Sequence, residues 1–309
     1  LKSRPHHRTL FMSHVLTLIA DPAKAGLDAA LAEAARAAIV AAGAKGGKPD
    51  WLKPGVACDI PVETADGAAA EAAARQALGR APVDVALQPA AGRRKRLLVA
   101  DMESTIIRNE MLDELAEFAG IRDRIADITR RAMNGELDFR AALSERVGLL
   151  KGLDAAILEQ AAKRIAIMPG ATALVGTMRA NGAYTALVSG GFRVFTDRVA
   201  RALGFDENAA NVLEIADGKL AGTVAEPILG RDAKLATLKR VAAAHGFGPA
   251  DALAVGDGAN DLDMLKAAGL GVAFHAKPVV AQAARVRVDH GDLTALLYLQ
   301  GYRAAEFVG

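Results

Sequence analysis

The chain up to residue 92 alternates short apolar runs with alanine-rich stretches. Four runs have the length and composition of strands: 15–19, 51–53, 56–62 and 83–88. Asp21 is placed to cap a helix over 23–42, and a second helix is predicted over 66–78. The resulting βαββαβ order predicts a small antiparallel sheet with two helices on one face.

From residue 97 onward, short apolar runs are separated by longer helical stretches. The strand candidates are 97–100, 184–188, 252–255 and 271–274. Helical stretches such as 171–181 and 233–245 lie between them, which is typical of a parallel sheet wrapped by helices. The stretch 107–169 has a helical, strongly charged pattern and is too long for one crossover. It therefore predicts an inserted cap over the carboxyl edge of the sheet.

Together these patterns predict an α/β protein in two domains. The expected bounds are a first domain over 12–92, a basic linker over 93–96 and a second domain over 97–309. We expect the linker, Arg93-Arg94-Lys95-Arg96, to be solvated rather than to bind a polyanion. Met12 fits a natural start, so residues 1–11 are expected to be a tail or extension.

Composition and charge exclude several classes of protein. The 309 residues are 52% hydrophobic and 24% charged, as in soluble globular chains. No apolar run reaches the roughly 18 residues of a membrane span. The net charge of +2 favours neither nucleic acid nor a membrane as a partner. The single cysteine, Cys58, cannot form an intrachain disulfide and is expected to be buried and inert, so we predict a cytoplasmic protein.

Candidate chemistry gathers where three predicted strands end, the edge at which open α/β sheets bind ligands. These ends carry Asp101-Met102-Glu103-Ser104-Thr105, Ser189-Gly190-Gly191 and Gly256-Asp257-Gly258-Ala259-Asn260-Asp261. One strand-end aspartate is usually a helix cap, but several converging carboxylates repel one another unless a cation lies among them. Oxygen donors without a paired histidine or cysteine favour Mg²⁺ over zinc.

The same region also has groups that could bind phosphate. Lys234, near the start of a predicted helix, supplies compact positive charge, while Ser189 and the amides of Gly190 and Gly191 supply hydrogen bonds. Each feature alone also fits a plain structural role, as a solvated lysine or a tight turn. The 256–261 loop does not fit a dinucleotide loop, because two acids would face the phosphate oxygens.

Taken in order, these motifs resemble the four motifs of the haloacid-dehalogenase-like phosphatases. Within that superfamily the chain is most similar to the phosphoserine phosphatases, through Glu110, Arg146, Phe192 and a predicted hairpin at 213–220. The resemblance spans 97–297 and implies a Rossmann-like parallel sheet with a helical cap. By element order alone, the first domain resembles small α+β ACT-like (ferredoxin-like) domains, which would allow a homodimer.

The resemblance implies a reaction and a role for each site residue. The reaction is hydrolysis of a small molecule, O-phospho-L-serine, to serine and phosphate, the last step of serine biosynthesis. Asp101 would be the nucleophile that forms an aspartyl-phosphate, and Glu103 the general acid-base. Mg²⁺ would be bound by Asp101, the carbonyl of Glu103 and Asp257, and Asp261 would support this metal site. The implied substrate contacts are Glu110, Arg146, Ser189, Gly190, Lys234 and Asn260.

One residue departs from the family pattern. The first motif usually reads Asp-x-Asp, whereas this chain has Glu103 at the second acid. Because Glu and Asp have similar intrinsic pKa values, acid-base function is expected to survive if the backbone or rotamer absorbs the extra methylene. Met133 and Phe139 could line the substrate pocket, although apolar residues of a helical cap more often form its core.

Two other functions stay open at this point. A phosphotransferase would pass the phosphoryl group to another alcohol, such as homoserine, instead of water. A non-enzymatic phospho-acceptor receiver also places a strand-end aspartate, an acid pair, Ser or Thr and Lys around Mg²⁺. The insertion over 107–169 argues against the receiver, because receivers have no cap.

Overall fold

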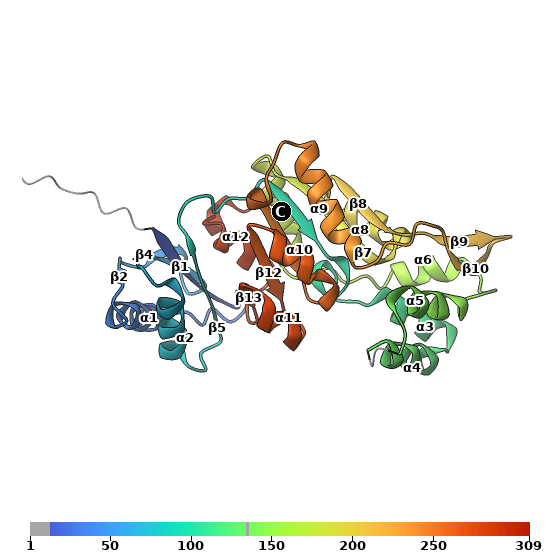
Figure 1. Ribbon diagram of the computed structural model, residues 1–309, viewed down its shortest axis with the longest axis horizontal. Helices are drawn as coiled ribbons and strands as arrows, with labels where there is room; N and C mark the ends of the chain where they lie inside the picture. Colours follow the sequence, from blue (N-terminus) through green and yellow to red (C-terminus); the bar gives the residue numbers. More distant parts are fainter. Residues whose placement is uncertain (1–12, 134–135) are drawn as a thin grey trace, which may run out of the picture. The chain divides into compact units, whose positions relative to one another are not determined.

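The computed structural model describes residues 13–133 and 136–309 (Figure 1). The extension predicted over 1–11 lies outside the described residues. The chain divides into two compact units. The first holds the described residues up to Arg94 together with Leu297–Ala305, and the second holds Lys95–Leu296 with Glu306–Gly309. The domain bounds given above remain predictions, and they do not include the return of Leu297–Ala305 to the first unit. Within the described ranges, no helix is long and apolar enough to cross a membrane.

The first unit contains the predicted antiparallel sheet. In the order β2-β4-β1-β5, with β3 beside β4, its strands are β1 (His14–Ala20), β2 (Lys45–Gly46), β3 (Asp50–Lys53), β4 (Ala57–Glu63) and β5 (Val83–Pro89). Its helices are α1 (Ala29–Ala41) and α2 (Gly67–Leu78). Ile39 of α1 and Leu78 of α2 join one hydrophobic core with alternate strand residues. Because alternate residues share a face, both helices cover the same side of the sheet.

The start of α1 differs from the prediction. The Asp21 carboxylate accepts the amide of Ala23 at 2.9 Å within a turn. The helix begins only after Asp28, whose carboxylate accepts the amide of Leu31 at 2.8 Å. Between them Ala25 has a φ of 47°, outside the helical range. The alanine-rich composition favours helix at all these positions, so it does not mark where the first turn begins.

Contrary to the prediction, the basic run at 93–96 is only partly solvated: Arg94 and Arg96 are exposed, whereas Arg93 and Lys95 are partly buried and bind other parts of the chain. In the first unit, Arg93 is nearly buried and donates to both carboxylate oxygens of Asp59, at 2.5 and 3.0 Å. In the second unit, the Lys95 ammonium donates to the carbonyl of Ala250 at 2.9 Å. A run of charges in the sequence does not reveal partners that come from distant parts of the chain.

The second unit contains the predicted parallel sheet, which has six strands. In spatial order they are β13 (Val286–Val288), β12 (Leu270–Phe274), β11 (Ala252–Gly256), β6 (Leu97–Ala100), β7 (Tyr184–Phe192) and β8 (Glu207–Asn211), and every neighbouring pair is parallel. The helices around it are α7 (Ala171–Ala180), α8 (Arg193–Leu203), α9 (Asp232–Ala244), α10 (Leu262–Ala267), α11 (Pro278–Ala283) and, at its end, α12 (Ala295–Leu299). The sequence analysis misses β8 and β13 because polar residues interrupt both.

The cap predicted over 107–169 is confirmed as a helical insertion between β6 and β7 (Figure 1). Its helices are α3 (Met111–Ala119), α4 (Arg122–Met133), α5 (Phe139–Gly148) and α6 (Ala156–Ala162). At its base, Ile107 and Ile167 form an antiparallel bridge. The predicted hairpin is formed by β9 (Leu213–Ala216) and β10 (Lys219–Val224). Backbone hydrogen bonds join Leu220 of this hairpin to residues 152–153 of the cap.

Candidate active site

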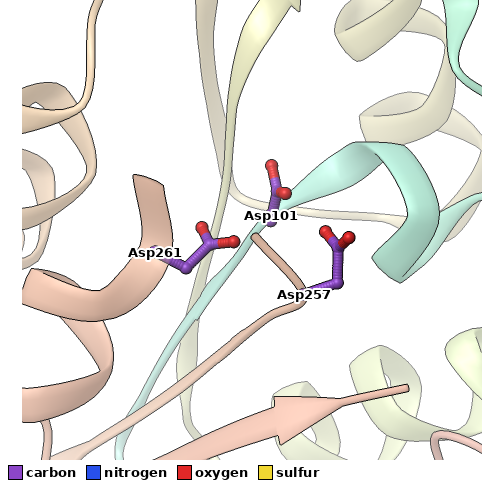
Figure 2. A group of neighbouring side chains, drawn as sticks. All are labelled: Asp101, Asp257 and Asp261. Atoms are coloured by element: carbon purple, nitrogen blue, oxygen red, sulfur yellow. The ribbon is translucent and has the colours of Figure 1, made fainter. Parts of the chain in front are cut away.

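Three buried aspartates converge at the carboxyl edge of the parallel sheet. Asp101 follows β6, Asp257 follows β11, and Asp261 precedes α10. Each can present an oxygen atom within 4.8 Å of the other two. Figure 2 shows their carboxylates around a common space. Because β6 and β11 are parallel neighbours, their carboxyl ends meet at the same edge.

Lys234 ties two of these aspartates together. Its Nζ lies 2.7 Å from Oδ1 of Asp101 and 2.6 Å from Oδ1 of Asp261. Burial alone would lower the pKa of Lys234, but the two carboxylates raise it to about 12. The lysine is therefore a permanent cation at the centre of the site.

The loop after β11 is shaped around Asp261. Its Oδ2 accepts the amide of Gly258 at 2.9 Å, so both carboxylate oxygens have a protein partner. A Cβ atom at Gly256 would overlap the carboxyl group of Asp261, and this close approach requires glycine. Asp261 is thus held in a fixed position, and its predicted role behind the metal ligands stays a prediction.

The charge that remains at the site fits a divalent cation. Oδ1 of Asp101 accepts the Met102 amide at 2.8 Å besides the lysine, while no hydrogen bond from the described residues reaches its Oδ2. Burial raises the pKa of Asp101 and of Asp257. Lys277 lies 3.6 Å from Asp257, but its side chain is largely exposed. Three carboxylates around one buried lysine leave negative charge that a cation on Asp101 and Asp257 would neutralise.

The Glu103 side chain points to the second strand end and to the cap. Its Oε2 accepts the Ser189 hydroxyl at 3.3 Å, and its Oε1 accepts the Met111 amide at 2.9 Å. A Cβ atom at Gly191 would lie 2.7 Å from Oε2, so this position suits glycine. Burial, followed by the nearby Glu110 carboxylate, raises the pKa of Glu103 to about 7. That value suits a group that both gives and takes a proton near neutral pH.

A cavity of about 170 Å³ lies between the sheet edge and the cap. The predicted site residues in its wall are Asp101, Glu103, Glu110, Arg146, Gly190, Asp257 and Asn260. Lys234 and Ser189 lie behind this wall, where they bind Asp101 and Glu103. The structure therefore brings every predicted site residue to one place.

Two opposite charges of the cap face this cavity. Glu110 precedes α3, and its Oε1 accepts the Ser104 hydroxyl at 2.6 Å. Arg146 lies on α5, and its Nε donates to the Ala142 carbonyl at 3.1 Å. Desolvation raises the pKa of Glu110 and lowers that of Arg146. Both effects follow from placing a charge in a small, partly enclosed space.

The cavity wall also contains residues that the sequence analysis did not single out. Leu112, Leu143 and Lys277 line it. Lys277 follows β12, so the strand-end argument that identified Asp257 would have found it. Phe139 lines the cavity instead of the cap core, contrary to the usual place of such residues. The Met133 side chain lies outside the described residues.

This fold and site define a class of protein. The family model for haloacid dehalogenase-like hydrolases matches residues 98–266. The chain belongs to this family.

Several proteins that are similar to this chain are named phosphoserine phosphatases. One from Streptomyces coelicolor is 45% identical over 247 residues, which cover 79% of this chain and 60% of the relative's length. Phosphoserine phosphatase SerB2 of Mycobacterium tuberculosis is 38% identical over 296 residues, 95% of this chain and 72% of its own length. The structure of a probable phosphoserine phosphatase from Vibrio cholerae superposes with a TM-score of 0.78 at 31% identity, covering 96% of this chain and 88% of that one.

Proposed function

We propose that the protein is a Mg²⁺-dependent phosphatase that hydrolyses O-phospho-L-serine to serine and phosphate. The observation that supports this best is one cavity lined both by two of the three clustered aspartates, Asp101 and Asp257, and by two opposite charges, Glu110 and Arg146. A phosphoserine molecule has a phosphate at one end and an ammonium and a carboxylate at the other. The names of the similar proteins support the same substrate.

In the proposed reaction, a carboxylate oxygen of Asp101 attacks phosphorus, and the bond from phosphorus to the serine oxygen breaks. Glu103 gives its proton to that oxygen. Glu103 then takes a proton from the water that attacks the aspartyl-phosphate, which releases phosphate and restores Asp101. Lys234 orients Asp101 and offsets its charge, since its Nζ lies 2.7 Å from Oδ1.

The oxygen-only donors favour Mg²⁺ as the cation of the site. When bound, Mg²⁺ would reduce the repulsion between the attacking carboxylate and the phosphate. Its proposed ligands are Asp101, Asp257 and the backbone carbonyl of Glu103, with Asp261 held behind them by Lys234.

Substrate binding is divided between the sheet edge and the cap. We assign the phosphoryl oxygens to the amide of Gly190 and to Asn260, which line the cavity, and to Ser189 and Lys234, which contact its lining residues Glu103 and Asp101. Arg146 would bind the substrate carboxylate, and Glu110 its ammonium group. These two side chains would distinguish phosphoserine from phosphate esters that lack an amino-acid end.

For the first unit we propose an ACT-like domain. Its order is βαββαβ with the two-residue strand β2 in addition, and this order supports the proposal together with the antiparallel sheet that has helices on one face. A homodimer formed through this domain stays a prediction of the resemblance. Burial raises the pKa of the Cys58 thiol to about 12, and an inert thiol agrees with a cytoplasmic enzyme of serine biosynthesis.

A phosphate-release assay across phosphoserine, phosphothreonine and sugar phosphates tests the proposal, with and without Mg²⁺. We expect Mg²⁺-dependent release with a strong preference for phosphoserine. Equal rates on sugar phosphates would contradict the substrate, and metal-independent release would contradict the cofactor. Product analysis with added homoserine separates hydrolysis from phosphotransfer, because a transferase would form phosphohomoserine.

A further inference from the structure

A buried asparagine that has no part in these steps lies beside the Ser189–Gly191 turn. Asn211 ends β8, and only 1% of its surface is exposed. Its Nδ2 donates to the Gly190 carbonyl at 2.8 Å and to the Leu229 carbonyl at 3.2 Å. Its Oδ1 accepts the Leu229 amide at 2.7 Å. Both amide hydrogens and the oxygen are therefore used to join two loops that are distant in sequence.

Both loops lead to groups that we assign to the phosphate. Gly190 follows Ser189, whose Oγ accepts the Gly191 amide at 2.8 Å, so the turn is closed on itself. Leu229 lies shortly before α9, which carries Lys234. A change in the Asn211 hydrogen bonds would therefore move the Ser189–Gly191 turn relative to α9.

The cap contacts the same two loops from the other side. A Cβ atom at Gly190 or at Gly230 would lie 3.5 Å from the Phe139 ring. Phe139 belongs to α5 of the cap and lines the cavity. Because Asn211 binds Gly190 and the residue next to Gly230, it fixes the surface on which this ring lies.

We infer that Asn211 is a positioning residue for phosphate binding, whose side-chain amide holds the Ser189–Gly191 turn in the orientation that receives the phosphoryl group. The inference rests on the proposed function, because it takes this turn to be the phosphate site. It predicts that the residue acts on every ligand with a phosphate, whatever the rest of the ligand is.

Asn211→Asp tests this role with little change in size. The new carboxylate keeps an acceptor for the Leu229 amide, but it removes both donors and repels the carbonyls of Gly190 and Leu229. With Mg²⁺ present, we expect inorganic phosphate to bind about tenfold more weakly by calorimetry. The KM for phosphoserine should rise by a similar factor. The ratio of kcat/KM between phosphoserine and an aryl phosphate should stay unchanged, because both carry the phosphoryl group.

Asn208 offers a matched control on the same strand. Its side chain accepts the Thr196 hydroxyl at 2.8 Å and donates to Asp197 at 2.9 Å, so Asn208→Asp likewise keeps an acceptor, loses its donor and places a carboxylate against an oxygen it had bound. This variant should keep the parental phosphate affinity. If Asn211→Asp does not fold, Asn211→Ala is measured against Asn208→Ala in the same way.

The outcomes separate this inference from the proposed function. If the unsubstituted protein neither binds phosphate nor releases it from phosphoserine, the proposed function is wrong. An active parent with equal phosphate affinity in the Asn211 variant overturns the inference alone. Equal losses in the Asn211 and Asn208 variants also overturn it, because they would show a general effect of loosening β8.

Discussion

Each unit of the molecule buries an ion pair against its sheet, and the two pairs differ in their surroundings. In the first unit, Asp59 receives two hydrogen bonds from Arg93 and one from the Thr17 hydroxyl at 2.7 Å. Arg93 also donates from Nε to the Leu299 carbonyl and from Nη2 to the Tyr298 carbonyl and the Thr17 hydroxyl, each at 3.1 Å. One cation thus meets one anion, and the hydrogen-bonding groups around them are matched.

In the second unit, Lys234 meets Asp101 and Asp261, and Asp257 lies close to both. Negative charge exceeds positive charge, and Asp101 and Asp257 border a cavity. The comparison teaches that a buried charge alone does not mark an active site. Uncompensated charge that opens into a cavity is a stronger indication, because a ligand or ion that binds there would neutralise it.

The largest predicted effect is that of Asp101→Asn. The amide keeps the shape of the side chain but loses the proposed nucleophile and a proposed metal ligand. Phosphate release from phosphoserine should fall by about 10⁴-fold or more, while the fold stays nearly intact. A steady-state assay with circular dichroism as a check on folding measures both.

Asp59→Asn in the first unit is the control for Asp101→Asn, because it makes the same substitution in the other buried ion pair. It leaves Arg93 without its buried anion and should cost about 3 kcal/mol of unfolding free energy. The rate per folded molecule should stay at the parental value. Substantial activity in Asp101→Asn, or a comparable loss of rate in Asp59→Asn, would abolish the distinction between the two ion pairs.

Glu103→Gln should slow phosphoserine hydrolysis by about 10² to 10⁴-fold. The loss should be smaller on an aryl phosphate, whose leaving oxygen hardly needs a proton. Glu103→Asp should retain activity. If the Glu103→Gln variant hydrolyses phosphoserine at the parental rate, Glu103 is not the general acid. If the substitution slows the hydrolysis of both esters equally, protonation of the leaving group by Glu103 does not limit the rate.

Because the pKa of Glu103 is raised, both the rate of phosphoserine hydrolysis and the folding stability should depend on pH near neutrality. With a pKa of about 7, Glu103 loses its proton as pH rises through neutrality, so the phosphoserine rate should fall on the alkaline side. The aryl phosphate profile should lack that fall. A carboxyl pKa above its unfolded value also means that folding stability decreases as pH rises from the ordinary glutamate pKa to about 7. The Gln variant should lose this decrease in thermal unfolding.

Asp257→Asn should weaken Mg²⁺ binding by about 100-fold, because one charged oxygen ligand is lost. The half-saturating Mg²⁺ concentration in the phosphate-release assay measures this. Excess Mg²⁺ should restore part of the rate. A titration curve equal to that of the parent would remove Asp257 from the metal site.

A smaller effect than that of Asp257→Asn is expected for Arg146→Ala, which changes selectivity. Arg146 is only partly buried, so the loss of its bond to the substrate carboxylate should cost about 2 kcal/mol, roughly thirtyfold in kcat/KM. An aryl phosphate, which has no such carboxylate, should be nearly unaffected. Equal losses on both substrates would show that Arg146 supports the structure or the phosphate instead.

Local patterns were sufficient to predict most of the sheet edge that carries the site. Apolar runs followed by acids or Ser-Gly-Gly place Asp101, Ser189 and Asp257 at strand ends, and parallel pairing brings these ends together. The cap was also predictable from the sequence, because the helical stretch between the first two strands is too long for a simple crossover.

The features that the sequence analysis missed depend on contacts between distant residues. Arg93 is buried because Asp59 and the returning segment Leu297–Ala305 surround it, and no local pattern records this. Asn211 is the last residue of a short, polar strand and becomes informative only through its bonds to Gly190 and Leu229. In the same way, the sequence identifies Glu103 as an acid but not its contact with the cap amide of Met111.

The covalent intermediate tests the central claim most directly. Acid-quenched samples taken during turnover of phosphoserine should contain a phosphorylated peptide that includes Asp101, and hydroxylamine should remove the label as it does from acyl phosphates. The label should be absent in Asp101→Asn and unchanged in Asp59→Asn. A stable phosphate on Ser104 or Ser189, or turnover without label at Asp101, would contradict the assignment of the uncompensated cluster as the site of phosphoryl transfer.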